Sequence, residues 1–481
     1  MKLRPYQLES IFELRIKYAS GTKRVLLVSP TGSGKSLMFC EILRSAYEKG
    51  RSAIMVVRGR SLVDQASEKL ADYQVPHGVC MAGHWNNRPH ERIQVCSIDT
   101  LHRRKIAPQA DIVVIDEAHT AGGESYKWLF AHYPDALFLG VTATPYGKKG
   151  LRHIADDYVI AISMQELIGQ KFLVPLKYYA WSTIDVTGVK IDSTGDFNGK
   201  QLYAAADNKK IYGDLVANYQ NLIPGKTALA FGVNVAHSKK IAESFNVAGI
   251  PAKHIDADSP LSERKKIIAE IERREILVIS SVGTMTTGID IPSLDAIIIA
   301  RPTASLNLHL QMIGRVTRTF PGKQVGIILD HAGNTVRHGL AEFNRAVNLD
   351  GFTPEKSDPK PVTCDKCYSV FCPVETSTTL DRNYICPACG HNNTPAKKER
   401  DDEIATADAD LSELSAEQLE HMTIRNDFDN YELLRKSTKN KDGKLYDWRW
   451  TFHRLIKDYG EHKISKVYPS QMKSIKWRQK T

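Results

Sequence analysis

The sequence predicts an α/β protein with two tandem, doubly wound parallel-sheet lobes, followed by a small cysteine-rich module and a mainly helical, basic C-terminal module. Short apolar runs alternate with amphipathic stretches through two successive parts of residues 1–350. This alternation is typical of parallel sheets that are covered by helices on both faces. Two cysteine pairs follow the second part, and the C-terminal end of the chain carries an excess of basic side chains.

The first lobe is expected over residues 1–150. Its buried strands are predicted at Val25–Val28, Ala53–Val57, Ile93–Ser97, Asp111–Ile115 and Leu137–Val141. Two helices between them are predicted at Lys35–Tyr47 and Leu62–Tyr73. The apolar strands are too short for helices of ordinary length, and the helices show the 3.6-residue period of an amphipathic surface.

The second lobe, with the connection leading to it, is expected over residues 151–350. Its strands are predicted at Thr227–Phe231, Ile276–Ser280, Ala296–Ile299 and Val325–Leu329. Its helices are predicted at Ala236–Phe245, Ser262–Glu272 and Leu306–Ile313. The stretch Ile184–Pro224 is interpreted as an elaborated entry to this lobe, and the Pro-rich, charged stretch Asp350–Pro361 as a linker.

Composition indicates a soluble globular protein. Of the 481 residues, 42% are hydrophobic and 25% are charged, which is ordinary for a chain with sizeable buried cores. No apolar run approaches the roughly 20 residues that span a bilayer, and the N-terminal stretch lacks the apolar segment of a secretory signal. We therefore expect a cytoplasmic protein, in the host cytoplasm if a phage encodes it. The net charge of +10 weakly favours polyanionic partners.

A phosphate-binding loop is predicted at Ser29–Ser36, SPTGSGKS, between a strand and a helix. Glycines let backbone N–H groups close around phosphate oxygens at the positive end of a helix. Lys35 would reach the β- and γ-phosphates of ATP, and the Ser36 hydroxyl would bind Mg²⁺. Nucleotide binding is accordingly assigned to Thr31, Gly32, Ser33, Gly34, Lys35 and Ser36.

An acidic pair, Asp116 and Glu117, follows the predicted strand DIVVI within the sequence DEAH. Open α/β sheets bind their ligands at the carboxyl ends of the strands. Asp116 would hold Mg²⁺, and Glu117 would orient and deprotonate the attacking water. An acidic pair after a strand is common, but its place on a strand beyond the P-loop strand favours the catalytic interpretation.

Two arginines, Arg315 and Arg318, lie three residues apart in QMIGRVTR and would share one helical face. Guanidinium groups aimed at a γ-phosphate stabilise the transition state of phosphoryl transfer. On its own the segment is better explained as a solvated basic turn. The preceding motifs favour the catalytic interpretation.

Taken together, the ordered motifs resemble those of superfamily-2 DEAH-motif helicases, with two RecA-like lobes, over roughly residues 1–345. The motifs are RPYQ at Arg4–Gln7, SPTGSGKS, DEAH, TATP at Thr142–Pro145, TTGIDIP at Thr286–Pro292, and QMIGRVTR. The resemblance is specific because these motifs occur in the same order and with the same spacing as in that family, and no single motif carries it alone. The short first lobe and the C-terminal modules are similar to those of phage and bacterial DNA-remodelling helicases of the branch-migration type.

This resemblance implies further roles. Arg4 and Gln7 would bind the adenine, Gln311 would join the catalytic set, and Gly288 and Asp290 would approach the ribose. His119, Thr142 and Thr144 would couple hydrolysis to lobe movement. Arg58, Ser97, Thr100 and Thr287 would contact nucleic acid. The segment SSVGTMTTGID departs from the commonest form of its motif, so Ser281 and Thr284 are alternatives to Thr287.

A zinc ribbon is predicted at residues 361–393. Cys364 and Cys367 form one CxxC pair and Cys386 and Cys389 another, with eighteen residues between the pairs. This spacing suits tetrahedral Zn²⁺ bound by four thiolates, and so small a module lacks the core to fold without metal. Cys372 and His391 are weaker candidates. The ribbon could bind nucleic acid, bind protein or brace the chain. The remaining thiols, Cys40, Cys80 and Cys96, are expected to be buried and reduced.

An acidic linker, residues 394–420 with a net charge of −6, precedes a basic module, residues 421–481 with a net charge of +8. Basic and aromatic residues alternate in this module, which favours direct nucleic-acid binding. The alternative is a small helical domain with Trp448, Phe452, Leu455 and Ile456 as its core. The two interpretations are compatible.

The predicted function is that of an ATP-dependent DNA helicase or translocase that separates strands or remodels junctions, with ATP, Mg²⁺ and Zn²⁺ as cofactors. An RNA helicase is the nearest alternative. A nucleic-acid-stimulated ATPase switch that docks a partner protein without unwinding is the alternative from another class.

Overall fold

The computed structural model describes the following residues: 3–147, 149–180, 184–192, 195–207, 209–282, 291–352, 362–363, 370–371, 374–375, 382–385, 390–393, 412–413, 424, 427–428, 431 and 449–468. The chain forms two compact units. The first comprises residues 1–176, 184–327 and 347–353, and the second comprises residues 177–183, 328–346 and 354–481.

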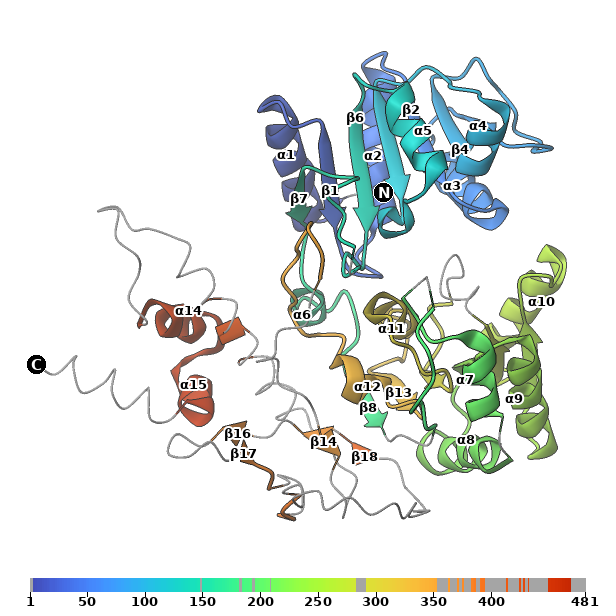
Figure 1. Ribbon diagram of the computed structural model, residues 1–481, viewed down its shortest axis with the longest axis vertical. Helices are drawn as coiled ribbons and strands as arrows, with labels where there is room; N and C mark the ends of the chain where they lie inside the picture. The colour runs from blue at the N-terminus through green and yellow to red at the C-terminus, as the bar shows by residue number, and fades with distance from the viewer. Residues whose placement is uncertain are drawn as a thin grey trace, which may run out of the picture. The chain divides into compact units, whose positions relative to one another are not determined.

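The first sheet has seven strands in the order β3-β4-β2-β5-β6-β1-β7 (Figure 1). Every neighbouring pair in it is parallel. Its strands are β1 (Arg24–Val28), β2 (Ala53–Val57), β3 (Gly78–Cys80), β4 (Ile93–Ser97), β5 (Ile112–Asp116), β6 (Leu137–Thr142) and β7 (Asp157–Ile160). Its helices are α1 (Pro5–Ala19), α2 (Lys35–Glu48), α3 (Arg60–Asp72), α4 (Ile98–Arg104), the 3-10 helix η1 (Ala118–Thr120) and α5 (Glu124–His132).

Both faces of this sheet are covered. Val25 and Leu27 of β1 pack in one apolar cluster with residues of α2 and α3, such as Leu43 and Leu70. The alternate β1 residues, Leu26 and Val28, pack in a second cluster with residues of α4 and α5. Successive side chains of a strand point to opposite faces, so the uninterrupted apolar run VLLV fits a strand buried on both sides.

The second sheet has the strand order β10-β11-β9-β12-β13-β8-β18. β9 is parallel to β11 and β12, β10 is parallel to β11, and β18 is antiparallel to β8. The strands are β8 (Leu176–Ala180), β9 (Ala228–Phe231), β10 (Ala252–Ile255), β11 (Val278–Ser281), β12 (Ala296–Ile299), β13 (Gly326–Asp330) and β18 (Ser412–Glu413). The helices are α6 (Met164–Gly169), α7 (Gly199–Ala206), α8 (Lys209–Leu222), α9 (Val235–Val247), α10 (Leu261–Glu272), α11 (Leu306–Ile313) and α12 (Asn334–His338).

After the second sheet the chain returns to the first lobe. Leu349 is buried in the first lobe's core. Its carbonyl accepts hydrogen bonds from the backbone N–H groups of Leu151 (2.7 Å) and Arg152 (2.9 Å). Gly150, with φ +66°, permits this approach, since a Cβ there would lie 2.3 Å from the Leu349 oxygen. Residues 347–352 thus pack as part of the first lobe.

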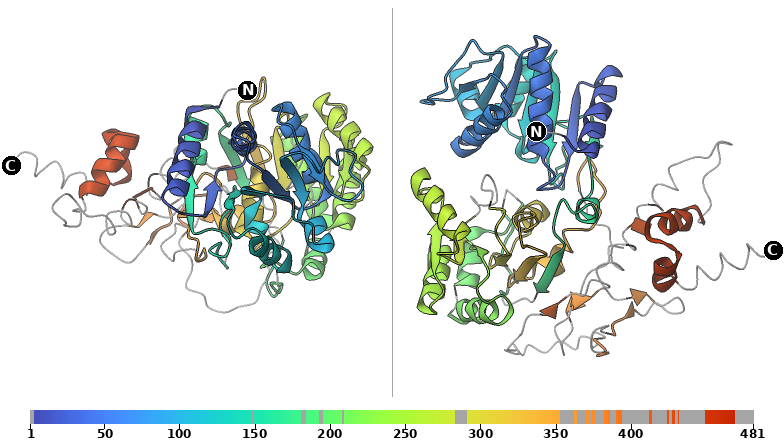
Figure 2. Two further views of the ribbon diagram at one scale, coloured as in Figure 1. Left: turned by 90° about the horizontal axis from the view of Figure 1, so that it is seen from above. Right: turned by 180° about the vertical axis from the view of Figure 1, so that it is seen from behind.

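Beyond residue 353 the described segments are short, apart from two helices drawn in red in Figure 2. The strand pairs are β14 (Val362–Thr363) with β15 (Val370–Phe371), and β16 (Val374–Glu375) with β17 (Arg382–Asn383). The helices α14 (Arg449–Tyr459) and α15 (Glu461–Val467) share a core that includes Phe452, Leu455 and Ile464. Phe452, Leu455 and Ile456, three of the four residues that the alternative interpretation of the basic tail assigns to a small helical core, therefore pack together. The fourth, Trp448, lies outside the described residues.

The predicted strands and helices of both lobes are present, with ends displaced by at most a few residues. One prediction was wrong in detail, because Cys80 is only partly buried, at the end of the edge strand β3, whereas Cys40 and Cys96 are buried. Across the part of the chain that can be described, no helix has the length and apolar character to cross a membrane.

Candidate functional site

The loop Ser29–Gly34 joins β1 to α2 at the carboxyl edge of the first sheet. Gly32 and Gly34 have φ angles of +84° and +80°, a region that favours glycine. The Ser29 hydroxyl donates to the Ser33 hydroxyl (2.6 Å), and both side chains are fully buried. The sequence therefore folds locally into a tight turn that ends at the N-terminus of α2, where backbone N–H groups favour an anion.

Lys35, the first residue of α2, lies against this loop. Its ammonium donates to the carbonyls of Ser29 (3.0 Å) and Pro30 (3.2 Å). Burial lowers the pKa of Lys35 to about 8, while the nearby carboxylates of Glu117 and Asp116 oppose that shift. A phosphate group would restore the favourable charge environment that burial removes.

The N-terminal segment, residues 4–7, is hydrogen-bonded to the Ser29–Gly34 loop. Gln7 is fully buried, and its amide donates to the Ser33 carbonyl (3.0 Å) and accepts from the Arg4 backbone N–H (2.9 Å). The Tyr6 hydroxyl also donates to the Ser33 carbonyl. The Arg4 guanidinium stacks 3.7 Å above the ring of Phe172. Arg4 and Gln7 therefore lie at the nucleotide loop, where the adenine assignment stays a prediction.

The acidic pair lies at the end of β5. Burial, followed by the charge of Glu117, raises the pKa of Asp116 to about 6. The Ser36 hydroxyl and the Asp116 carboxylate supply the hard oxygen ligands that Mg²⁺ prefers. A buried carboxylate with a raised pKa is stabilised by a cation, so these residues fit the metal that the loop implies.

Lys69 of α3 was not predicted from the sequence. Its ammonium donates to the Ser36 hydroxyl (2.8 Å), and it lies near enough to Asp116 for that carboxylate to oppose the lowering of its pKa by burial. A cation thus lies beside the oxygens assigned to Mg²⁺. No motif marks Lys69, because only the packing of α3 on α2 brings it there.

A chain of polar contacts connects the acidic motif with the second lobe. His119 Nδ1 lies 2.8 Å from the Thr142 hydroxyl, which also accepts from the Thr144 backbone N–H (3.1 Å). On the other side of the ring, His119 Nε2 lies 3.2 Å from the Gln311 amide nitrogen at the end of α11. Burial lowers the pKa of His119 to about 4, so the imidazole is neutral at pH 7.

The arginines that follow α11 lie at the same site. The charges of Arg315 and Arg318 both contribute to the lowering of the Lys35 pKa, and Glu117 is the carboxylate that acts on Arg315. Burial lowers the pKa of each arginine to about 10, which leaves both charged at neutral pH. The structure therefore places the predicted guanidinium groups near the phosphate-binding lysine.

The residues predicted to contact nucleic acid lie farther along the same sheet edge. Arg58 follows β2 and is exposed, its guanidinium 3.4 Å from the Ser125 hydroxyl. Ser97 ends β4 beside Val57 of β2, and Thr100 lies in the first turn of α4. Because all strands of this sheet are parallel, these residues share one edge with the P-loop and Asp116.

Several predicted site residues lie outside the described residues. They are Thr287, Gly288 and Asp290 of the second lobe and the four cysteines Cys364, Cys367, Cys386 and Cys389. In the described ranges alone, no group of three or more His, Cys, Asp or Glu side chains is placed to hold a metal ion. The zinc site stays a prediction.

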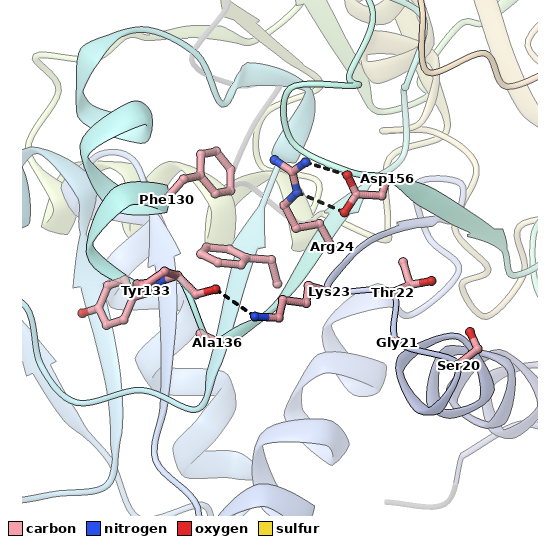
Figure 3. A pocket seen from close by; sticks show the side chains of 11 residues that line it. Ser20, Gly21, Thr22, Lys23, Arg24, Phe130, Tyr133, Ala136 and Asp156 are labelled. Atoms are coloured by element: carbon pink, nitrogen blue, oxygen red, sulfur yellow. Dashed lines mark hydrogen bonds and ion pairs between the residues drawn. The ribbon is translucent and has the colours of Figure 1, made fainter.

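A cavity of about 610 Å³ lies elsewhere on the first lobe (Figure 3). It is lined by residues at the start of β1 and β6, among them Arg24 and Phe138, and by Phe130 of α5; Arg24 pairs with Asp156 at 2.5 Å. The amino ends of the strands form this edge, so the cavity is at the edge opposite to the P-loop.

A lysine beside a glycine-rich loop, a partly buried acidic pair and arginines from a second α/β lobe are the arrangement expected of a two-lobed P-loop ATPase. Residues 1–147 match the family described as "Type III restriction enzyme, res subunit", and residues 214–320 match "Helicase conserved C-terminal domain". The chain therefore carries both motor domains of a superfamily-2 helicase, which support nucleic-acid-dependent ATPase activity.

Known relatives fit this class. The chain is 28% identical over 374 residues to the 51.5 kDa protein of a Lactococcus phage, covering 76% of this chain and 78% of the relative. It is 22% identical over 363 residues to the DNA 3'-5' translocase XPB2 of Sulfurisphaera tokodaii, covering 66% of this chain and 79% of the relative. A Saccharomyces cerevisiae relative, 29% identical over 357 residues, is covered over only 51% of its length.

Among solved structures, the fold is similar to that of the ATP-dependent Type ISP restriction-modification enzyme LlaBIII bound to DNA. The TM-score is 0.51 at 18% sequence identity, and the match covers 68% of this chain and 28% of that enzyme. At this identity the similarity concerns the fold, and it supports two α/β lobes of the RecA-like helicase kind.

Gly314 offers a test of the contact between the lobes. It ends α11 with φ −57°, which alanine can adopt, but a Cβ there would lie 2.6 Å from Thr31 Cβ in the P-loop. We expect Gly314→Ala to lower kcat/KM for ATP roughly tenfold or more without lowering Tm, because it displaces the arginines from the phosphates. Gly213→Ala in α8, where a Cβ meets open space, is the matched control. Wild-type turnover by Gly314→Ala would contradict this.

Proposed function

We propose that this protein is an ATP-dependent DNA translocase or helicase that uses the closing of two lobes around ATP to separate strands or remodel junctions. One observation carries the proposal. The segment that carries Arg315 and Arg318 lies against the phosphate-binding loop: a Cβ at Gly314 would lie 2.6 Å from Thr31 Cβ, and a Cβ at Gly32 would lie 3.9 Å from Arg318 Cγ. ATP bound at the loop would therefore be held by charges from both lobes.

The proposed cycle follows from this charge arrangement. Arg315, Arg318 and Lys35 carry like charges and repel one another, and the phosphates of ATP would neutralise that repulsion. The γ-phosphate would favour the closed arrangement, and its loss on hydrolysis would weaken it. Glu117 would hold and deprotonate the attacking water, while bound Mg²⁺, held by Ser36 and Asp116, would neutralise phosphate charge.

His119 would transmit the state of the nucleotide, ATP or its hydrolysis products, between the two lobes. Its neutral ring lies between Thr142 of the first lobe and Gln311 of the second. When the two lobes open, the contact between Gln311 and His119 would be lost. His119 could then change its contact with Thr142, and through Thr142 affect Thr144. Arg58 and the α4 N-terminus lie on the same sheet edge, so we propose that they hold the strand that the motor moves.

DNA is the favoured substrate. The Sulfurisphaera relative is named a DNA translocase, and the structurally similar restriction-modification enzyme is bound to DNA. We propose junction remodelling, including branch migration, as the form that this DNA activity takes. RNA remains the alternative substrate, and an ATPase switch that docks a protein without unwinding is the alternative mechanism.

We also propose that the cysteine pairs at Cys364–Cys367 and Cys386–Cys389 bind one structural Zn²⁺. Their spacing supports this, since four thiolates suit tetrahedral zinc. We expect the purified chain to contain about one equivalent of zinc by atomic emission. The double substitution Cys386→Ser with Cys389→Ser should lose that metal, and a double variant that retains it would contradict the proposal.

Arg318 tests the catalytic arrangement. We expect Arg318→Ala to lower the kcat for ATP roughly 10³-fold or more while a fluorescent ATP analogue still binds, because the charge is needed most in the transition state. Arg273→Ala is the control, since Arg273 is exposed in the second lobe and pairs with Glu275 at 2.6 Å. ATPase activity near that of the wild type in Arg318→Ala would remove Arg318 from the catalytic set.

The overall function is tested by measuring ATPase rates and strand displacement on single strands, forks, four-way junctions and RNA duplexes. We expect DNA to stimulate hydrolysis more than RNA does, and forks or junctions to be unwound. The Glu117→Gln variant should still bind ATP and nucleic acid, but it should unwind neither forks nor junctions. Stimulated hydrolysis without displacement of any strand would favour the switch instead.

A further inference from the structure

Trp85 is the most exposed large apolar side chain in the part of the chain that the structure describes, with 85% of its surface accessible. It lies in the loop 81–92 between β3 and β4. Tryptophan carries a large apolar ring that is usually covered in folded proteins. A ring left open on an ordered loop is therefore a candidate contact surface.

The loop holds Trp85 outward through its neighbours. His84 and Asn86 are both buried, with accessible fractions of 7% and 6%. His84 Nε2 lies 3.1 Å from the Asp64 carboxylate of α3, and the Asn86 carbonyl accepts the Val79 backbone N–H at 2.8 Å. The His84 ring also stacks beside the indole, with centroids 5.7 Å apart. Trp85 is thus fixed from both sides with its ring exposed.

The rest of the loop is packed down as well. The Gln94 side chain donates to the Arg88 carbonyl (2.7 Å), and the Arg60 guanidinium donates to the Gly83 carbonyl (3.3 Å). Gly78 is required at this point, because a Cβ there would lie 2.2 Å from the Arg88 oxygen. These contacts restrain the loop, which reduces the entropy that binding would cost.

The position of the loop connects it with the proposed nucleic-acid surface. Cys80 ends β3 beside Cys96 of β4, and Ser97 lies beside Val57, the residue before Arg58. Because these strands are parallel, the loop after β3 leaves the same edge as Ser97 and Arg58. Trp85 therefore lies on the carboxyl edge of the first sheet, beside its outermost strand β3, whereas the P-loop follows β1 near the other end of the strand order.

Two exposed arginines from neighbouring elements lie on the same side of the sheet as Trp85. Arg60, the first residue of α3, donates to the Gly83 carbonyl of the loop (3.3 Å), and Arg58 follows β2. Aromatic rings combined with basic side chains bind single strands, since bases stack on the ring and phosphates pair with the cations. An exposed tryptophan could also anchor a protein, but the arginines on this edge favour nucleic acid.

We propose that Trp85 is a stacking platform for an unpaired base of the strand bound along the carboxyl edge of the first lobe. The inference rests on the proposed function, to which it adds a site for single-stranded nucleic acid. Stacking by a fixed ring does not read sequence, so the site accepts any base. At a fork, the ring would hold a base after it has left its partner.

The test uses the full chain with single-stranded DNA and RNA oligonucleotides that carry 2-aminopurine. We expect the wild type to quench the 2-aminopurine fluorescence and Trp85→Ala to lose the quench, with an affinity roughly tenfold or more weaker. Trp85→Phe should retain much of both, because it keeps an aromatic face. Val247→Ala, at an equally exposed apolar residue in α9, is the control. ATPase activity without nucleic acid should be unchanged in all three.

The outcomes separate the two proposals. Wild-type quenching and affinity in Trp85→Ala would overturn the stacking platform, even if the motor unwinds forks. Equal losses in Val247→Ala would also overturn it. If the wild type quenches 2-aminopurine through Trp85 but displaces no strand, the stacking site stands and the helicase proposal fails. If the wild type binds neither oligonucleotide, both proposals fail.

Discussion

Lys35 and Asp116 are removed from water at one site, and this shared desolvation moves their pKa values in opposite directions. The lysine falls to about 8 and the carboxylate rises to about 6, so each loses part of its tendency to be charged. Two further cations come from the second lobe, the buried Arg315 and the partly buried Arg318. A nucleotide with its metal would add the phosphate charge that this group of cations favours.

The parallel order of the strands explains why one edge can hold both the nucleotide and the polymer. Each connecting loop of the first sheet leaves from the carboxyl end of its strand, so the P-loop, Asp116, Thr142, Arg58 and Ser97 are delivered to that edge by topology. His119, which follows the acidic pair, then contacts Gln311 of the second lobe. The proposed coupling between ATP hydrolysis and lobe movement therefore uses short polar contacts made by residues at the edge of the first sheet.

Much of this arrangement could be predicted from the sequence, because the apolar strands are strong local signals and each motif follows one directly. The strands β3, β7, β8 and β10 were not predicted, since GVC is very short and DYVI, LKYYA and AKHI each contain a charged residue. The two-residue strand β18 was not predicted either, because it falls in the expected acidic linker. Without β3, the position of Trp85 at the sheet edge could not be inferred. Lys69 was missed for a similar reason, because it reaches Ser36 only through the packing of two helices.

The return of the chain to the first lobe has a practical consequence. Leu349 fills part of that lobe's core, and its carbonyl binds two backbone N–H groups there. A truncation that ends with β13 would leave an apolar hole and two unsatisfied donors in the first lobe. The shortest stable two-lobed fragment must therefore extend through Phe352, although none of the recognised motifs lies in those last residues.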